Sequence, residues 1–269
     1  MKAPAMKLHL PDHPTQLYLI RHGEVEERYH KVFGGSRIDM ALSPLGLRQA
    51  EAVNQWLADT PLDAIYSSPM LRVRQTLAPT SEAKEMPPVY FDGLREIDFG
   101  DWTGHRWDEV QSTFGVSAFD WLEIIEDSGI PGGESSSEIA TRVGTYLQQI
   151  LDGHPHQRVA IFCHGGIIRV ILALLLRMPL PKMAHFNIEM AASPSSSSSQ
   201  RKNTPSKSSY SIFSRPSSPS TTLISMVVNM GTATLKKPLA MAMNKPTPLA
   251  EPSHVDDFPI AALRLRFRC

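Results

Sequence analysis

The chain has 269 residues, with 27 basic and 27 acidic side chains and 42% hydrophobic residues. This composition is typical of a globular protein of one large domain or two small ones. Because there is no net charge and no long basic run, nothing supports nucleic-acid binding as the main activity, and an anionic ligand must be attracted locally.

The first predicted element is a buried strand over 17–20, an apolar run that leads into Arg21-His22-Gly23. A helix follows, with Ser43 as its N-cap and Pro44 at its first position. Its expected buried stripe is Leu47, Ala50, Val53 and Leu57. A short strand over 63–66 precedes Ser67-Ser68-Pro69, which is expected to start the next helix in the same way and to place Arg72 in its first turns.

The middle of the chain has a third predicted strand over 88–91. It is followed by an irregular segment, 94–104, whose glycines and interleaved polar and aromatic residues indicate a loop that places side chains. Residues 105–127 are expected to be helical. Ser135 and Glu138 have the spacing of a capping box, and the helix that they open is expected to end at Gly153.

A second apolar run, 159–163, leads into His164-Gly165-Gly166 and then into a largely apolar helix over 167–178. The alternation of strands and helices predicts an α/β fold, a three-layer α/β/α sandwich around a mainly parallel sheet. Parallel strands present their carboxyl ends at one edge of such a sheet, where ligands bind. His22 and His164 are therefore expected to meet there, together with Arg21.

The composition changes abruptly after 191. Residues 193–220 contain 14 serines and four prolines in 28 positions, so we expect a disordered linker over 192–222. Beyond it, 221–228 and 260–267 are candidate strands. The second is the better candidate for an edge strand, because Leu263, Leu265 and Phe267 alternate with arginines. The expected organisation is an N-terminal extension (1–15), a main domain (16–191), the linker and a tail (223–269).

Membrane insertion and secretion are not indicated. Residues 1–16 lack the uninterrupted apolar core of a signal peptide. The most apolar stretch, 167–176, is interrupted by Arg169 and is too short to span a bilayer. Cys163 lies in a predicted buried strand and Cys269 is the last residue, so no structural disulfide is expected. We expect a cytoplasmic protein with no membrane partner.

Five motifs follow one another along the main domain. They are Arg21-His22-Gly23-Glu24, Ser67-Ser68-Pro69 with Arg72, Glu96 with Gly100-Asp101-Trp102 and Gly104, Gly132-Gly133-Glu134-Ser135, and His164-Gly165-Gly166. In order and spacing they resemble the histidine phosphatase superfamily, in its phosphoglycerate-mutase-like branch, from about residue 16 to residue 191. The resemblance implies a three-layer α/β/α fold and transfer of a phosphoryl group through a phosphohistidine.

The residues support this chemistry on physical grounds as well. A neutral imidazole is a competent nucleophile near its unperturbed pKa of ~6.5, so His22 is the expected nucleophile in two in-line displacements. Phosphoryl transfer spreads charge over the equatorial oxygens, which Arg21, Arg72 and His164 would bind. These cations can replace a metal, and no Cys/His cluster has metal-ligand spacing, so no metal and no cofactor are expected.

The departing alkoxide needs a proton. Glu96 is the expected general acid, because its position between the strand end and the glycine turn matches the family motif, and it could later deprotonate the attacking water. Asp98 and Asp101 are the alternatives in the same loop.

The chain departs from the family pattern in two places. Relatives often have Asn where this chain has Arg28. Residues Arg28, Gly34 and Gly35 are therefore candidates for substrate selection. An equal alternative is that Arg28 is only an exposed arginine of a loop. The other departure is the serine-rich segment, which is either an inserted linker or the start of a replaced C-terminus. The compact 99–104 loop resembles the phosphatase side of the branch, which includes α-ribazole phosphatases and broad phosphomonoesterases.

The leading hypothesis is therefore a metal-independent phosphomonoesterase acting on small phosphorylated metabolites, with α-ribazole phosphate among the candidate substrates. The alternative from another class is a phosphate-binding or scaffolding protein with little turnover. Within enzymes, phosphoglycerate mutase and fructose-2,6-bisphosphatase activities are the alternatives.

Overall fold

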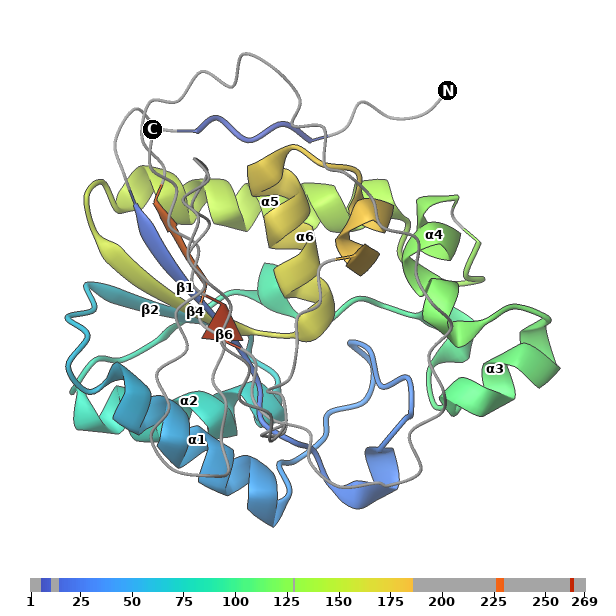
Figure 1. Ribbon diagram of the computed structural model, residues 1–269, viewed down its shortest axis with the longest axis horizontal. Helices are drawn as coiled ribbons and strands as arrows, with labels where there is room; N and C mark the ends of the chain where they lie inside the picture. The colour runs from blue at the N-terminus through green and yellow to red at the C-terminus, as the bar shows by residue number, and fades with distance from the viewer. Residues whose placement is uncertain (1–5, 11–14, 128, 186–225, 230–261, 264–269) are drawn as a thin grey trace, which may run out of the picture.

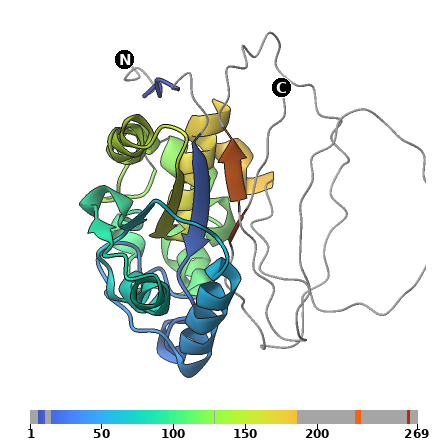
Figure 2. The same ribbon diagram turned by 90° about the vertical axis from the view of Figure 1, so that its left-hand side faces the viewer.

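A mixed sheet between two layers of helices forms the framework of the protein (Figures 1 and 2). This computed structural model describes residues 6–10, 15–127, 129–185, 226–229 and 262–263. Among these residues the sheet has six strands, in the order β3-β2-β4-β1-β5 with β6 also paired to β1. Four strands are parallel: β1 (Gln16–Arg21), β2 (Ala64–Ser67), β3 (Val89–Tyr90) and β4 (Arg158–Cys163). The mainly parallel α/β fold expected from the sequence is confirmed.

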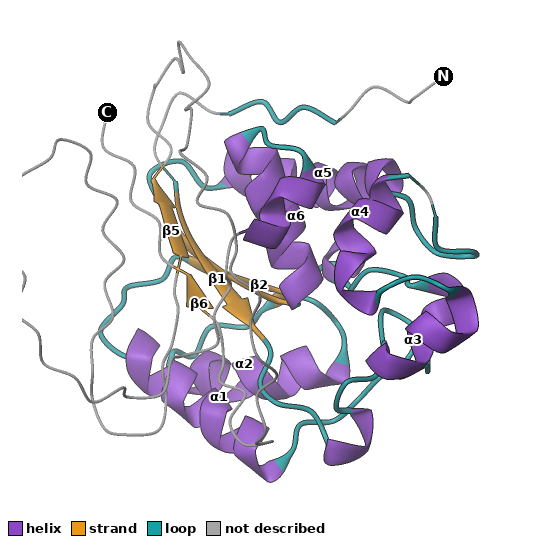
Figure 3. Ribbon diagram, turned by 45° about the vertical axis from the view of Figure 1, so that its right-hand side comes forward, coloured by secondary structure: helices purple, strands orange, loops and turns teal. Residues whose placement is uncertain are grey.

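The helices cover both faces of this sheet. α1 (Pro44–Leu57) and α2 (Leu71–Ala83) pack on one face, and α5 (Ser136–Gly153) and α6 (Gly165–Leu176) on the other (Figure 3). Successive side chains of a strand point to opposite faces. Accordingly, Leu17 and Leu19 of β1 pack with α5 and α6, whereas Tyr18 and Ile20 pack with α1 and α2. The first strand thus contributes to both cores.

Two expected helix starts are confirmed in detail. The Ser43 hydroxyl accepts a hydrogen bond from the Gly46 amide at 3.0 Å, with Pro44 opening α1. Ser135 and Glu138 form a capping box at the start of α5, which ends at Gly153. The predicted stripe of α1 is wrong at Leu47, which is 49% exposed. Gly46 and Gln49 are buried in α1 together with Ala50, Val53 and Leu57.

The expected helix over 105–127 is interrupted, which corrects the sequence prediction. α3 (Trp107–Phe114) ends at Gly115, which adopts φ +72° as a left-handed C-cap. A 3-10 turn (Ala118–Asp120) then leads into α4 (Trp121–Glu126). Glycine enters the left-handed region without steric cost, so Gly115 ends the first helix and turns the chain toward the second.

Two short C-terminal strands lie along the same edge of β1. β5 (Met226–Asn229) is antiparallel to Gln16–Tyr18, and β6 (Ala262–Leu263) is antiparallel to Leu19 and Ile20. Both candidate strands of the tail therefore contribute residues to the sheet, and the one that the sequence favoured forms the shorter pairing. The predicted linker over 192–222 lies outside the described residues.

The N-terminal extension is described in part. Leu8 is buried, and the main chain of His9 exchanges two hydrogen bonds with the Gln148 side chain of α5, each of 2.8 Å. None of the helices in the described ranges has the length and apolar character needed to cross a membrane.

Candidate active site

Three adjacent strands end at one edge of the sheet and bring the expected site residues together. β1 leads to His22, β4 to His164 and β2 to Ser68. The His22 amide donates to the Cys163 carbonyl at 3.1 Å, and the Ser68 amide donates to the Phe162 carbonyl at 2.9 Å. The rings of His22 and His164 meet edge to face, with centroids 5.3 Å apart. The meeting of the two histidines expected from the sequence is observed.

The surroundings of His22 fix its tautomer and its charge. Nδ1 lies 2.8 Å from the Gly23 carbonyl oxygen, which can only accept, so Nδ1 carries the proton and the Nε2 lone pair is free. Burial, followed by the cations Arg72 and Arg21, lowers the pKa of His22 well below its ordinary value. His22 is therefore neutral near pH 7 and has the lone pair that a nucleophile requires.

Gly23 holds this turn close to the neighbouring helices. Its amide donates to the Thr76 hydroxyl of α2 at 2.9 Å. A Cβ atom on Gly23 would lie 2.7 Å from the Gly46 carbonyl oxygen of α1, so only glycine allows this close approach. The main chain beside His22 is thereby fixed by both helices of that layer.

His164 faces Ser68 and keeps one ring nitrogen unpaired. Its Nε2 lies 2.9 Å from the Ser68 hydroxyl, and its buried Nδ1 has no hydrogen-bond partner among the described residues. Burial, then Arg72 and His22, lower the pKa of His164 well below its ordinary value. Because an unpaired buried polar atom is costly, Nδ1 is suited to a polar group brought by a ligand.

The interaction of Ser68 with His164 accompanies a later start of α2 than the sequence predicts. The expected N-terminal role of Ser67-Ser68-Pro69 is wrong, because α2 begins at Leu71. Its Leu71 amide is satisfied by an Asp39 carboxylate oxygen at 2.8 Å instead. Arg72 still lies in the first turn, as expected.

The two arginines of the site are cations partly removed from water, because Arg72 is buried and Arg21 is half-buried. Arg72 donates to the carbonyls of Ile38 and Gly35, at 3.1 Å each, and burial lowers its pKa to about 10. Burial also lowers the pKa of Arg21, an effect that the nearby Glu96 carboxylate opposes. Gly35 has φ +51°, and a Cβ atom on it would lie 2.7 Å from the Ile97 carbonyl oxygen. Glycine at this position lets the 35–38 segment approach both Arg72 and the loop of Glu96.

Glu96 lies at the N-terminus of α6. Its Oε1 accepts from the Ile97 amide at 3.0 Å, and its Oε2 lies 3.5 Å from the Gly166 amide. The same carboxylate interacts electrostatically with Arg21, Arg72 and Arg169. It is thus the carboxyl group of this loop that lies among the site's cations.

The two alternative carboxylates are placed differently. Asp98 uses Oδ1 within the loop, accepting from the Gly100 amide at 2.9 Å and pairing with Arg37 Nε at 2.8 Å. Asp101 is exposed.

Arg28 and Gly34 stand apart from these contacts. Arg28 lies in a 3-10 turn (Glu27–Tyr29), with its side chain 68% exposed and paired with Glu26 at 2.9 Å. Its guanidinium also lies 4.8 Å from the centre of the Tyr29 ring. Gly34 is buried against Met40, whose methyl group would collide with an added Cβ atom.

Sequence reasoning missed two groups around the site. The sequence indicates Arg169 only as an interruption of an apolar helix. In the structure its half-buried side chain lies near Arg21 and Glu96, and burial lowers its pKa to about 10. Glu134 was part of a motif without an assigned role, and it forms an ion pair with Arg142 at 2.7 Å. An arginine inside an apolar run beside His-Gly-Gly was a signal that could have identified Arg169.

In the part of the chain that the structure describes, no His, Cys, Asp and Glu side chains gather as a group that could hold a metal ion.

Known proteins resemble the chain over the region that builds this site. Residues 17–204 match the family model of the histidine phosphatase superfamily (branch 1). Phosphoserine phosphatase 1 of Hydrogenobacter thermophilus is 32% identical over 178 residues, 66% of this chain and 84% of that protein. Adenosylcobalamin/alpha-ribazole phosphatase of Salmonella typhimurium is 26% identical over 174 residues, 65% of this chain and 86% of that protein.

A solved structure agrees with these sequence matches. The mycobacterial glucosyl-3-phosphoglycerate phosphatase is 25% identical, and the match covers 64% of this chain and 84% of that one with a TM-score of 0.58. On the family match, the identities and the shared fold, this chain belongs to the histidine phosphatase superfamily.

Proposed function

We propose that the protein is a phosphomonoesterase that hydrolyses small phosphorylated metabolites through a phosphohistidine on His22. The observation that carries this proposal is the free Nε2 lone pair of a half-buried, neutral His22 beside Arg21, Arg72 and His164. Similarity to phosphatases named for phosphoserine, α-ribazole and glucosyl-3-phosphoglycerate supports the reaction class. The group that these names share is a phosphate ester, so the proposal for this chain is a phosphate monoester of a small metabolite.

The first step transfers the phosphoryl group to the protein. His22 Nε2 forms a bond to phosphorus while the ester P–O bond breaks, and the leaving oxygen takes a proton from the acid form of Glu96. Arg21 and Arg72 bind the phosphoryl oxygens. Because both guanidinium groups are desolvated, little water screens their attraction to the charge on these oxygens. His164 Nδ1 donates the remaining hydrogen bond when that nitrogen carries the proton.

The second step releases phosphate. The Glu96 carboxylate takes a proton from a water molecule, whose oxygen bonds to phosphorus while the P–N bond to His22 breaks. His22 returns to its neutral form with Nδ1 still donating to the Gly23 carbonyl. In this scheme the protein's own cations supply the charge stabilisation, so the proposed reaction needs no metal.

The proposal is tested by trapping the intermediate. The protein is incubated with nitrophenyl phosphate in the presence of a chelator, quenched in alkali and analysed by mass spectrometry. We expect turnover, and we expect mass spectrometry to find a phosphoryl group on His22, because phosphohistidine survives the alkaline quench. His22→Ala should abolish both the label and the turnover, whereas His9→Ala, on the exposed N-terminal segment, should change neither. Turnover without label, or a label on another residue, contradicts the mechanism.

Arg28, Gly34 and Gly35 are proposed to influence substrate selection. The Arg28 side chain is 68% exposed, so it can reach the outer part of a substrate, and its ion pair with Glu26 is an exposed contact that a substrate anion can replace. In this proposal Arg28 takes no part in the bond-breaking steps. Arg28→Asn should shift KM between singly and multiply charged phosphate esters and leave kcat within about threefold. Identical kinetics with all substrates would show that Arg28 is only a surface residue.

A further inference from the structure

The loop that carries Glu96 depends on contacts from outside for its shape. Within the described residues it lies between two 3-10 turns, Asp92–Leu94 and Gly100–Trp102, and has no helix or strand of its own between them. The hydrogen bonds of the Glu96 side chain are one within the loop, from the adjacent Ile97 amide to Oε1, and one at 3.5 Å, from the Gly166 amide to Oε2.

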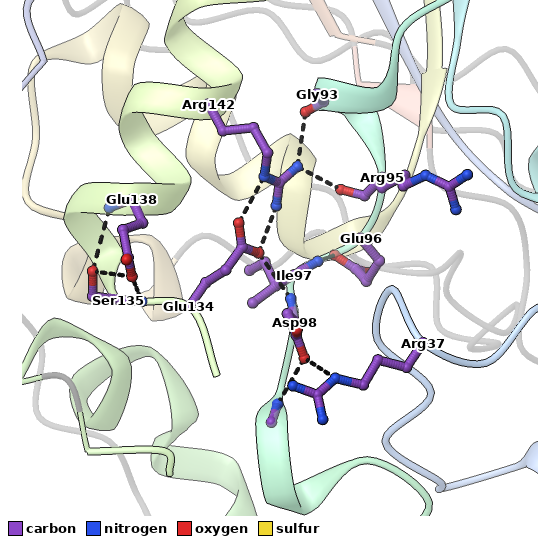
Figure 4. Close-up of polar contacts among 11 residues, drawn as sticks. Arg37, Gly93, Arg95, Glu96, Ile97, Asp98, Glu134, Ser135, Glu138 and Arg142 are labelled. Atoms are coloured by element: carbon purple, nitrogen blue, oxygen red, sulfur yellow. Dashed lines mark hydrogen bonds and ion pairs between the residues drawn. The ribbon is translucent and has the colours of Figure 1, made fainter. Parts of the chain in front are cut away.

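An arginine from α5 binds the loop before Glu96 (Figure 4). Arg142 Nη1 donates to the Gly93 carbonyl at 2.9 Å and to the Arg95 carbonyl at 3.0 Å. Its other donors, Nε and Nη2, form a bidentate ion pair with Glu134, at 2.7 Å each. Planar, two-point contacts of this kind fix orientation as well as distance.

Glu134 binds the same loop after Glu96. Its Oε2 accepts from the Asp98 amide at 2.9 Å, and its own amide donates to the Asp98 carbonyl at 2.9 Å. The ion pair therefore holds the main chain on both sides of Glu96. Both side chains are mostly buried, with 23% of Arg142 and 21% of Glu134 exposed.

The ion pair is not needed to start α5. The capping box of that helix is made by Ser135 and Glu138, whose carboxylate accepts from the Ser135 amide at 2.8 Å and its hydroxyl at 2.7 Å (Figure 4). Glu134 and Arg142 instead direct their hydrogen bonds to the loop.

We propose that Glu134 and Arg142 are positioning residues that hold Glu96 where it can protonate the leaving group. This inference rests on the proposed function, in which Glu96 is the general acid. A general acid must lie within hydrogen-bonding distance of the atom that it protonates, so small displacements of its main chain reduce its contribution. Binding of the phosphoryl group depends on Arg21, Arg72 and the histidines and should change little.

The test compares Glu134→Gln and Arg142→Lys with the wild-type protein on two substrates. Nitrophenyl phosphate has a leaving group that needs little protonation, whereas β-glycerophosphate releases an alkoxide that needs a full proton. Both variants should lower kcat/KM, which reports only the steps up to release of the leaving group, by about 10- to 100-fold for β-glycerophosphate and by less than about threefold for nitrophenyl phosphate. Inhibition by inorganic phosphate should stay within about twofold.

The matched control is Glu138→Gln. It weakens the capping box four residues along the same segment without touching the Glu96 loop, so it should lower thermal stability and leave the ratio of the two kcat/KM values unchanged. This ratio does not depend on how much of a variant is folded, so partial unfolding does not obscure the result.

The positioning role would be overturned if Glu134→Gln and Arg142→Lys left the ratio of the two kcat/KM values unchanged. It would also be overturned if Glu138→Gln changed this ratio by as much as they do. A wild-type protein that forms phosphohistidine and turns over both substrates keeps the proposed function intact in each of those cases. A wild-type protein with neither phosphohistidine nor turnover would overturn the proposed function and this inference together.

Discussion

At the residue scale, the neutral state of His22 is produced by its surroundings. The imidazolium form is disfavoured by the loss of water around the ring and by the positive charges of Arg72 and Arg21 nearby. The Gly23 carbonyl accepts the hydrogen bond of the remaining proton, on Nδ1. The same cations that would bind phosphate in the proposed mechanism therefore favour the neutral form of His22, which the proposed attack on phosphorus requires.

This arrangement predicts a pH-dependent cost to stability. The folded pKa of His22 is lowered, so below its unfolded pKa of ~6.5 the unfolded chain binds more protons than the folded one. The free energy of unfolding should then fall with decreasing pH by up to about 1.4 kcal/mol per pH unit for each such histidine. His22→Asn can still donate to the Gly23 carbonyl but cannot titrate.

The measurement is urea unfolding of the wild-type protein and His22→Asn at pH 7.5 and pH 5. The difference in unfolding free energy should move in favour of the variant at pH 5. A difference that is the same at both pH values would show that His22 titrates alike in the folded and unfolded states.

The role of Glu96 gives a second prediction at this scale. Glu96→Gln retains the shape of the side chain but removes the acidic proton. The ratio kcat/KM, which reports only the steps up to release of the leaving group, should therefore fall about 10²- to 10⁴-fold for alkyl phosphates and much less for nitrophenyl phosphate. Steady-state kinetics on both substrates provide the measurement. Asp98→Asn should not reproduce this selectivity, because Asp98 is bound to Arg37 and to the Gly100 amide. Equal losses on both substrates would point to a binding or folding defect.

At the element scale, β1 connects the site to the C-terminal part of the chain. Its last residues lead to Arg21 and His22, and its outer edge is paired with β5 and β6. An unpaired strand edge leaves main-chain hydrogen-bonding groups without protein partners, so these short strands protect the strand that leads to His22.

Truncation tests this protection. A chain ending at Val255 lacks β6, and a chain ending at Thr222 lacks both β5 and β6. At about 0.5–1.5 kcal/mol for each lost hydrogen bond, the first truncation should lower Tm by a few degrees and the second by more. Thermal unfolding followed by circular dichroism measures both. If neither truncation lowers Tm, the C-terminal strands do not stabilise the edge of β1.

At the scale of the whole molecule, one sheet supplies both cores. Strands β1 and β4 send alternate side chains into the α1–α2 layer and the α5–α6 layer. Loss of either layer therefore exposes the same strands, and the described domain should unfold in a single transition.

Matched substitutions on the two faces test this expectation. Val53 of α1 and Val143 of α5 are both fully buried, in different clusters. Val→Ala at either position should cost about 1–3 kcal/mol through the lost transfer energy and the cavity left behind. Because the sites share no partners, the double variant should show the sum within about 0.5 kcal/mol, in one denaturation transition. Two separate transitions in any variant would show that the layers unfold independently.

Local patterns in the sequence predicted most of the elements and which residues gather at the candidate site. Apolar runs that end in His-Gly predicted the parallel sheet and the meeting of His22 with His164. The Ser-Pro signal at Ser43 and the capping box at Ser135 predicted the starts of α1 and α5. Glu96 was also predicted in this way, because its motif lies within a few residues, and its role as the general acid stays a prediction.

Contacts between residues far apart in the sequence could be seen only in the folded chain. Ser68 hydrogen-bonds to His164 instead of capping α2, and Arg142 binds carbonyls 47 and 49 positions earlier in the chain. Such contacts depend on how α5 packs beside an irregular loop, which no local periodicity records. Burial, too, is a property of the packed layers, and it is burial that makes His22 neutral and Arg72 a desolvated cation.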